Sequence, residues 1–154
     1  MTETRADRSR TVELWVWPDR DLLLEQRELV VDRLRTLLAR GALDEVAVRE
    51  WPHQLDVTAE PRALDPAARE ARECLEDVRA WADERGVTLP LPEPVPGGTG
   101  RMGPTHQFQD LPRLMLVERV DGRVRFAAPC EVDGERCGVA SHVERLEEGL
   151  EVPV

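Results

Sequence analysis

The residues best suited to chemistry lie near the end of the chain. Cys130, Cys137 and His142 carry thiol and imidazole groups, which are ligands that zinc prefers. The paired cysteines of common zinc motifs lie two to four residues apart, and these two are more widely spaced. Three interpretations stay open: a zinc site, a reversible disulfide between the two cysteines, and a packed Cys130 with an exposed Cys137.

The other candidate residues favour structure over catalysis. Cys74 falls on the apolar face of an expected helix, where a cysteine packs as a small hydrophobic residue. His53 and His106 lie in expected loops without a nucleophile or acid at motif spacing. The many carboxylates single out no acid–base pair. The sequence therefore predicts neither a catalytic residue nor a cofactor, and we expect replacement of all three cysteines to leave binding intact.

Composition sets the class of protein. The 154 residues suit one domain, and 31 acidic against 21 basic residues give a net charge of −10. Such acidity is typical of proteins from extreme halophiles, because surface carboxylates keep a protein hydrated in molar salt. The charge argues against direct binding of nucleic acid, which requires a basic surface. No apolar run is long enough for a membrane span or a signal peptide, so we expect a cytoplasmic protein.

The first half of the chain predicts a βαβ unit followed by a helix. Residues 1–10 are polar and are expected to form a disordered lead-in to a domain over 11–150. Residues 11–17 favour a strand, 19–41 a helix and 43–51 a second strand parallel to the first. Residues 52–64 are expected to be a loop. Asp65-Pro66 then starts a helix that stops at Gly86.

The second half predicts a loop, a hairpin and a last helix. Prolines and glycines make 87–104 a long loop. Asp121-Gly122 lies between two apolar runs, which is a strong signal for an antiparallel hairpin. After a turn at Asp133-Gly134, apolar residues from Val139 to Leu150 follow a helical period.

This order of elements resembles the thioredoxin-like fold. The likeness rests on a first strand ending in Trp17-Pro18 before a helix and on Leu111-Pro112 before the hairpin. It implies an α/β domain with a mixed sheet, a cis bond before Pro112, and a binding groove between these two loops. The family's redox cysteines are missing, since Pro18 is followed by Asp-Arg-Asp, so redox activity does not carry over. Trp17, Pro18, Arg20 and Pro112 are the candidate partner-binding residues.

The chain is also similar to small acidic haloarchaeal proteins that are labelled helix-turn-helix domain proteins. The similarity lies in VELWV, RLRTLLARGALDEVAV, WADERGV and a late hairpin ending in APC. A helix-turn-helix joins two helices by a short turn, whereas strand or loop patterns flank both long helices here.

From these observations we expect a noncatalytic binding or regulatory module whose partner is a protein. A transcription-associated regulator is the alternative, and a redox or zinc protein using Cys130 and Cys137 is a third. The sequence leaves the oligomeric state open.

Overall fold

A four-stranded mixed sheet forms the centre of the molecule. The computed structural model describes residues 8–18, 20–97 and 106–154. The strands are β1 (Arg10–Val16), β2 (Glu45–Glu50), β6 (Leu114–Val120) and β7 (Arg123–Ala128), in the order β2-β1-β6-β7. β1 and β2 are parallel, while β6 runs antiparallel to both of its neighbours. The predicted mixed sheet with a parallel first pair is confirmed.

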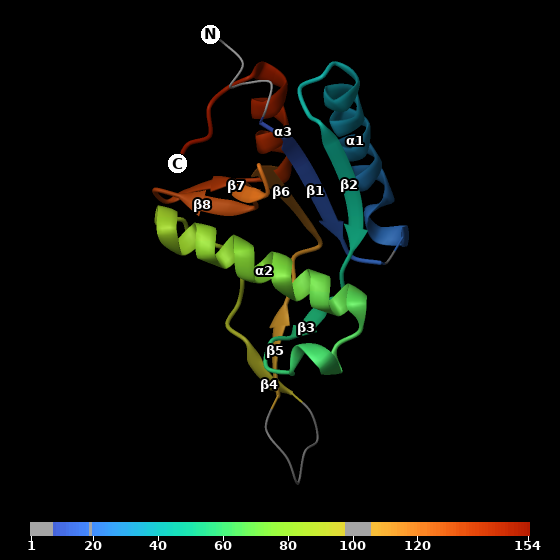
Figure 1. Cartoon of the computed structure of the whole chain (residues 1–154), viewed down its shortest axis with the longest axis vertical. Helices are drawn as coiled ribbons and strands as arrows, with labels where there is room; N and C mark the ends of the chain where they lie inside the picture. Colours follow the sequence, from blue (N-terminus) through green and yellow to red (C-terminus); the bar gives the residue numbers. More distant parts are fainter. Residues whose placement is uncertain (1–7, 19, 98–105) are drawn as a thin grey trace.

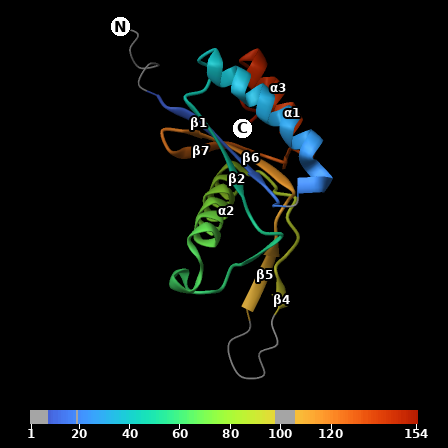
Figure 2. The ribbon, with the colours of Figure 1, turned by 90° about the vertical axis from the view of Figure 1, so that its right-hand side faces the viewer.

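Helices cover both faces of this sheet. Helices α1 (Arg20–Ala39) and α3 (Val139–Glu148) lie side by side on one face, and α2 (Pro66–Arg85) crosses the other (Figures 1 and 2). Arg33 of α1 joins Glu147 of α3 through two hydrogen bonds, of 2.9 and 2.6 Å. Because both faces are covered, β6 is buried along Met115–Glu118 without an alternating pattern. The result is a single three-layer α/β domain.

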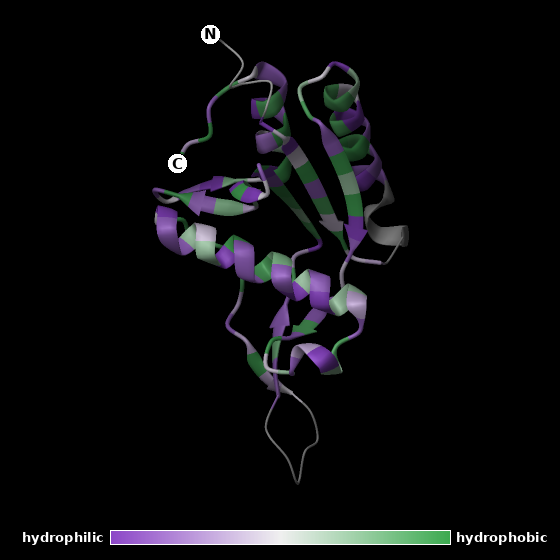
Figure 3. Ribbon diagram, viewed as in Figure 1, coloured by the Kyte–Doolittle hydropathy of each residue, from purple (hydrophilic) through white to green (hydrophobic). Residues whose placement is uncertain are grey.

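Local signals fix the ends of α2 as the sequence predicts. The Asp65 carboxylate accepts a hydrogen bond from the Ala68 amide at 2.7 Å, and Pro66 occupies the first turn. Gly86 ends the helix in the left-handed conformation, at φ 68°. Figure 3 shows apolar residues interleaved with polar ones along this helix. Its buried residues, which face the sheet, are Ala71, Cys74, Leu75, Val78, Trp81 and Ala82.

A small second sheet occupies the far end of the molecule, where the sequence predicts loops. It contains β3 (Gln54–Asp56), β5 (His106–Asp110) and β4 (Val95–Gly97) in that order, and a 3-10 helix, Pro61–Ala63, follows β3. Within the predicted loops 52–64 and 87–104, the prediction is therefore wrong for Gln54–Asp56, Pro61–Ala63 and Val95–Gly97, and residues 98–104 lie outside the described part. His106, also expected in a loop, begins β5. These strands are too short to show a pattern, and only their pairing across the fold makes them strands.

A second hairpin follows the predicted one. The β6–β7 hairpin turns at Asp121-Gly122 as expected. Strands β8 (Cys130–Val132) and β9 (Glu135–Cys137) then pair around Asp133-Gly134, whose φ angles are 52° and 80°. The sequence identifies this turn but misses its two strands, because each has only three residues.

Two further expectations need correction. The cis X-Pro bond among the described residues is Ala128–Pro129, so the prediction of a cis bond before Pro112 is wrong. The prediction of disorder over residues 1–10 is wrong for Arg10, because this residue pairs with Val120 in the sheet. Residues 1–7 lie outside the described part. None of the described helices is long and apolar enough to cross a membrane.

Candidate functional site

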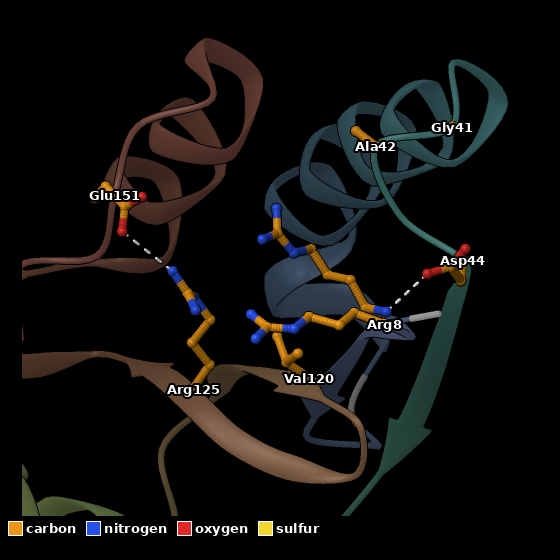
Figure 4. Close-up of a pocket in the computed structure, with 8 residues that line it drawn as sticks. Arg8, Gly41, Ala42, Asp44, Val120, Arg125 and Glu151 are labelled. Carbon is orange, nitrogen blue, oxygen red and sulfur yellow. Dashed lines mark hydrogen bonds and ion pairs between the residues drawn. The ribbon is translucent and has the colours of Figure 1, made fainter. Parts of the chain in front are cut away.

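A cavity lined by arginines opens at one end of the central sheet. Its volume is about 620 Å³, and it lies between the end of α1 and the segment after α3 (Figure 4). The start of β1, the hairpin β6–β7, the α1–β2 turn and the C-terminal segment all contribute to its lining. The lining residues are Arg8, Arg10, Gly41, Ala42, Asp44, Val120, Arg125 and Glu151.

A buried carboxylate anchors two of these arginines. Glu118 of β6 is 1% exposed, and its Oε2 lies 3.5 Å from Nε of Arg10 and 3.7 Å from Nε of Arg125. Its other oxygen, Oε1, lies 2.8 Å from Nε2 of His142. A buried carboxylate is costly unless it is paired and hydrogen-bonded, and three partners meet that need. Glu118 thus holds Arg10 and Arg125 in place from beneath the cavity.

His142 extends this polar group into the core. Its ring is fully buried on α3 and stacks on Phe126, with the ring centroids 4.4 Å apart. Its second nitrogen, Nδ1, has no hydrogen-bond partner among the described residues. The histidine therefore connects helix α3 to the carboxylate that positions the cavity arginines.

The acidic residues around the cavity leave several guanidinium donors unoccupied. Asp44 accepts a hydrogen bond from the backbone amide of Arg10 at 2.7 Å, and Glu151 pairs with Arg125 at 3.4 Å. Arg8 is exposed and forms no ion pair with any described residue. Since a guanidinium has five N–H donors, Arg8 and Arg10 retain donors for an anion.

A second hollow lies beside the same hairpin, towards α2. Its volume is about 430 Å³, and Arg85, Arg119 and Arg123 contribute to its lining. Arg119 is bound to Glu13 at 3.0 Å and to Asp77 at 3.0 Å. Exposed Arg85 and Arg123, by contrast, form no ion pair within the described part of the chain. We call Arg8, Arg10, Arg85, Arg119, Arg123 and Arg125 the arginine end.

The predicted partner-binding residues occupy a different place, at the opposite end of β1. Trp17 donates from Nε1 to the Leu111 carbonyl at 3.1 Å and packs against His53 at a tilt of 45°, with the ring centroids 4.1 Å apart. Trp51 donates from Nε1 to the Pro112 carbonyl at 3.0 Å. Hydrogen bonds from the two tryptophans therefore join these segments, between which the sequence predicts a binding groove. Pro18 is exposed, and the side chain of Arg20 lies outside the described part.

A groove adjoins Pro112 but not Pro18. It measures about 550 Å³ and lies between α1, the beginning of β6 and the beginning of α3. Leu29, Pro112, Pro129 and Val139 give it apolar walls, and Leu29 is 64% exposed. Of the three predicted residues whose side chains the structure describes, only Pro112 lines this groove.

The cysteines do not belong to the arginine end, and the chain neighbours Pro129, Arg136 and Gly138 of two of them line the apolar groove. Cys130 and Cys137 face each other across the β8–β9 hairpin, and the expected exposed Cys137 is buried, with 8% exposure. His142 binds Glu118 instead of joining them. Within the described ranges no three side chains of the metal-binding types gather into a metal site. Burial raises the pKa of the Cys74 thiol to about 12, and that residue lies in the core as predicted.

Comparison with known families decides the classification of the chain. A family model described as a helix-turn-helix domain matches residues 4–151, nearly the whole length. The chain belongs to this helix-turn-helix domain family. No curated protein and no solved structure gives a significant match. In this member of the family, strands separate each α-helix from the next along the described chain, as the sequence predicts.

Sequence reasoning missed the arginine end entirely. Its members come from the start of β1, the end of α2 and the β6–β7 hairpin, which are distant in sequence. One signal was present, since Arg119, Arg123 and Arg125 flank the predicted Asp121-Gly122 turn. Three basic residues around one tight turn must lie close together in any hairpin.

Proposed function

We propose that this protein is a noncatalytic regulator of transcription that contacts nucleic-acid phosphates through its arginine end. Membership of the helix-turn-helix domain family over residues 4–151 is the observation that carries the proposal. The family description favours the transcription-associated alternative over a module that binds only proteins. It also supports a nucleic-acid partner, against the expectation from net charge that direct electrostatic binding of nucleic acid is unlikely.

The distribution of charge supports this assignment. The chain carries a net charge of −10, yet six arginines gather around one hairpin and two hollows. Phosphate binding depends on the local arginine side chains, which displace the counterions condensed on the nucleic acid, and not on the charge of the whole molecule. Arg8, Arg85 and Arg123 are exposed without an ion pair to the described residues, so they can bind phosphate without first breaking a salt bridge.

The proposed architecture is thioredoxin-like without redox chemistry. The order β2-β1-β6-β7, with β6 opposite in direction to the other strands, supports it, as do the helices on both faces. Pro18 follows β1 where a redox member of that fold carries cysteine, and the residues up to Asp21 include none. We therefore propose a scaffold for binding in the cytoplasm of a halophile.

The apolar groove supports a second candidate function, the binding of a protein segment. Exposed Leu29 lines a groove of about 550 Å³ together with Pro112 and Val139, and a contiguous exposed apolar surface of this kind marks a protein interaction site. A transcriptional regulator with both surfaces would contact nucleic acid at one end of the sheet and a protein at the other. The two functions are separable by mutation.

Fluorescence anisotropy with labelled duplex DNA at increasing KCl concentrations tests the first function. We expect the logarithm of the association constant to fall linearly with the logarithm of salt concentration. The double variant Arg8→Ala/Arg123→Ala removes two phosphate contacts, so the slope should become shallower by about 1.8. Circular dichroism at each salt concentration establishes that the protein is folded.

Arg62→Ala is the matched control. Arg62 is 92% exposed on the 3-10 helix, outside the arginine end, and its one ion pair among the described residues is with Glu60 at 3.8 Å. Its removal should leave the slope unchanged. An unchanged slope in the double variant, or no DNA binding by the folded protein, would contradict the proposal.

Affinity capture at molar salt with nuclease treatment tests the second function. Leu29→Glu should abolish capture of a nuclease-resistant protein partner and leave the DNA slope intact. Capture that survives this substitution would exclude the groove as the protein-binding surface.

A further inference from the structure

Two buried thiols face each other across the β8–β9 hairpin. Cys130 is fully buried and Cys137 is 8% exposed, and the register pairs them directly. The neighbouring pair is Glu131 with Arg136, and the backbone of Glu131 bonds outward to Thr88, at 2.7 and 3.0 Å. Because Glu131 directs its backbone groups to Thr88, Glu131 and Arg136 form a non-hydrogen-bonded pair. Hydrogen-bonded and non-hydrogen-bonded pairs alternate along an antiparallel ladder, so Cys130 and Cys137 form a hydrogen-bonded pair.

This register suits a covalent bond. The Cα atoms of a hydrogen-bonded antiparallel pair are about 5.5 Å apart, within the range that a disulfide spans. The Cys137 thiol is near enough to contribute to the raised pKa of the Cys130 thiol. Both sulfurs are already on the same side of the hairpin, so closure requires no change of register.

We propose that Cys130 and Cys137 form a reversible disulfide and make the β8–β9 hairpin a redox modification site. This proposal is independent of nucleic-acid binding, because both cysteines lie outside the arginine end. Cys137 immediately precedes Gly138, the N-cap residue of α3. The bond would therefore tie the beginning of α3 to the end of the central sheet.

The oxidant is a small-molecule disulfide, which takes up the two electrons that the protein thiols lose. The Cys137 thiolate attacks one sulfur of the oxidant, releases one small thiol and forms a mixed disulfide. The Cys130 thiolate then attacks the Cys137 sulfur, releases the second small thiol and closes the protein disulfide. Two protein thiols are oxidised, one small disulfide is reduced to two thiols, and the two protein protons end on those thiols.

Burial sets the expected rate of the second step. Burial first, and the adjacent Cys137 second, raise the pKa of the Cys130 thiol to about 12. Only the thiolate attacks a disulfide, so closure should become faster as pH rises from 7 to 9. Cys137, which is slightly exposed, is the entry point for the oxidant.

The experiment exposes the folded full-length protein to 2-hydroxyethyl disulfide and follows it by intact-protein mass spectrometry. We expect a loss of about 2 Da, a cross-linked peptide joining Cys130 to Cys137, and a single remaining thiol at Cys74. Dithiothreitol should reverse the change. The oxidised protein should melt about 5 °C higher than the reduced one, because a short loop is closed.

Two substitutions make the result specific. Cys74→Ser should lose the same mass at the same rate, since Cys74 lies on α2. Cys137→Ala should lose no mass, and circular dichroism would show that it is folded. A stable mixed disulfide on Cys137, a disulfide-linked dimer, or no reaction of the folded protein would each overturn the proposal.

Discussion

Nε2 of His142 lies 2.8 Å from Oε1 of Glu118, with the two side chains 0% and 1% exposed. This contact joins α3 to β6 in the interior, and the other oxygen of Glu118 holds Arg10 and Arg125 at the cavity. One buried carboxylate therefore connects the packing of the core to the arrangement of the arginine end.

Removing the Glu118 carboxylate should lower the stability of the protein. Glu118→Ala leaves the buried His142 ring and two arginines without their partner, and we expect a loss of about 3 kcal/mol in the free energy of unfolding. Urea unfolding at pH 7 measures it. The control is Glu147→Ala, which breaks a half-exposed pair with Arg33 and should cost about 1 kcal/mol or less. Equal losses in the two variants would contradict the role of Glu118.

Asp56 should make the stability of the small sheet depend on pH. Burial alone raises the pKa of Asp56, but hydrogen bonds from Thr58, Ala59 and His106 outweigh burial and lower it. A carboxyl whose pKa is lower in the folded state stabilises the protein above its unfolded pKa, about 3.9. This stabilisation is lost as pH falls through the folded pKa.

The variant Asp56→Ala tests this linkage. It should cost about 1 to 2 kcal/mol at pH 7 and clearly less at pH 3, as measured by urea unfolding of both proteins. Asp83→Ala, at an exposed position on α2, provides the control. If the cost of Asp56→Ala is the same at the two pH values, the hydrogen bonds do not stabilise the ionised form.

Replacing Gly97 by alanine, the smallest substitution, should destabilise the protein. A Cβ atom at this position would collide with the ring of Phe108 on the paired strand β5. Gly97→Ala should therefore lower stability by about 1 to 3 kcal/mol, measured by thermal unfolding. At Gly138 a Cβ would meet nothing within 4 Å, so Gly138→Ala should cost less than Gly97→Ala, at most about 1 kcal/mol from the lower preference for Ala at the N-cap of α3. A neutral Gly97→Ala would show that the ring moves aside without cost.

The fold should become more stable as salt concentration rises. The net charge of −10 produces self-repulsion that dilute buffer does not screen. We expect the melting temperature to increase from low to molar KCl in thermal scans followed by circular dichroism. A melting temperature that does not rise would exclude the interpretation of this acidity as an adaptation to salt.

The sequence by itself determined the elements whose signals are local. Asp65-Pro66 and Gly86 bound α2 because a cap and a left-handed glycine act within one turn. Asp121-Gly122 specifies the β6–β7 hairpin because both residues adopt positive φ, at 54° and 82°. The parallel β1–β2 pair followed from the length of the helical connection between two short apolar runs.

Only the tertiary structure decided which distant residues meet. Gln54 pairs with Asp110 in the small sheet, and neither segment has a pattern that specifies its partner. In the sequence nothing distinguishes Glu118 from the many other carboxylates of this acidic chain. It is buried because helices cover β6 on both faces, and it meets His142 because α3 packs there. The arginine end likewise exists because the start of β1, the end of α2 and the β6–β7 hairpin lie at the same edge of the domain. Such contacts depend on the packing of whole elements, which no short stretch of sequence encodes.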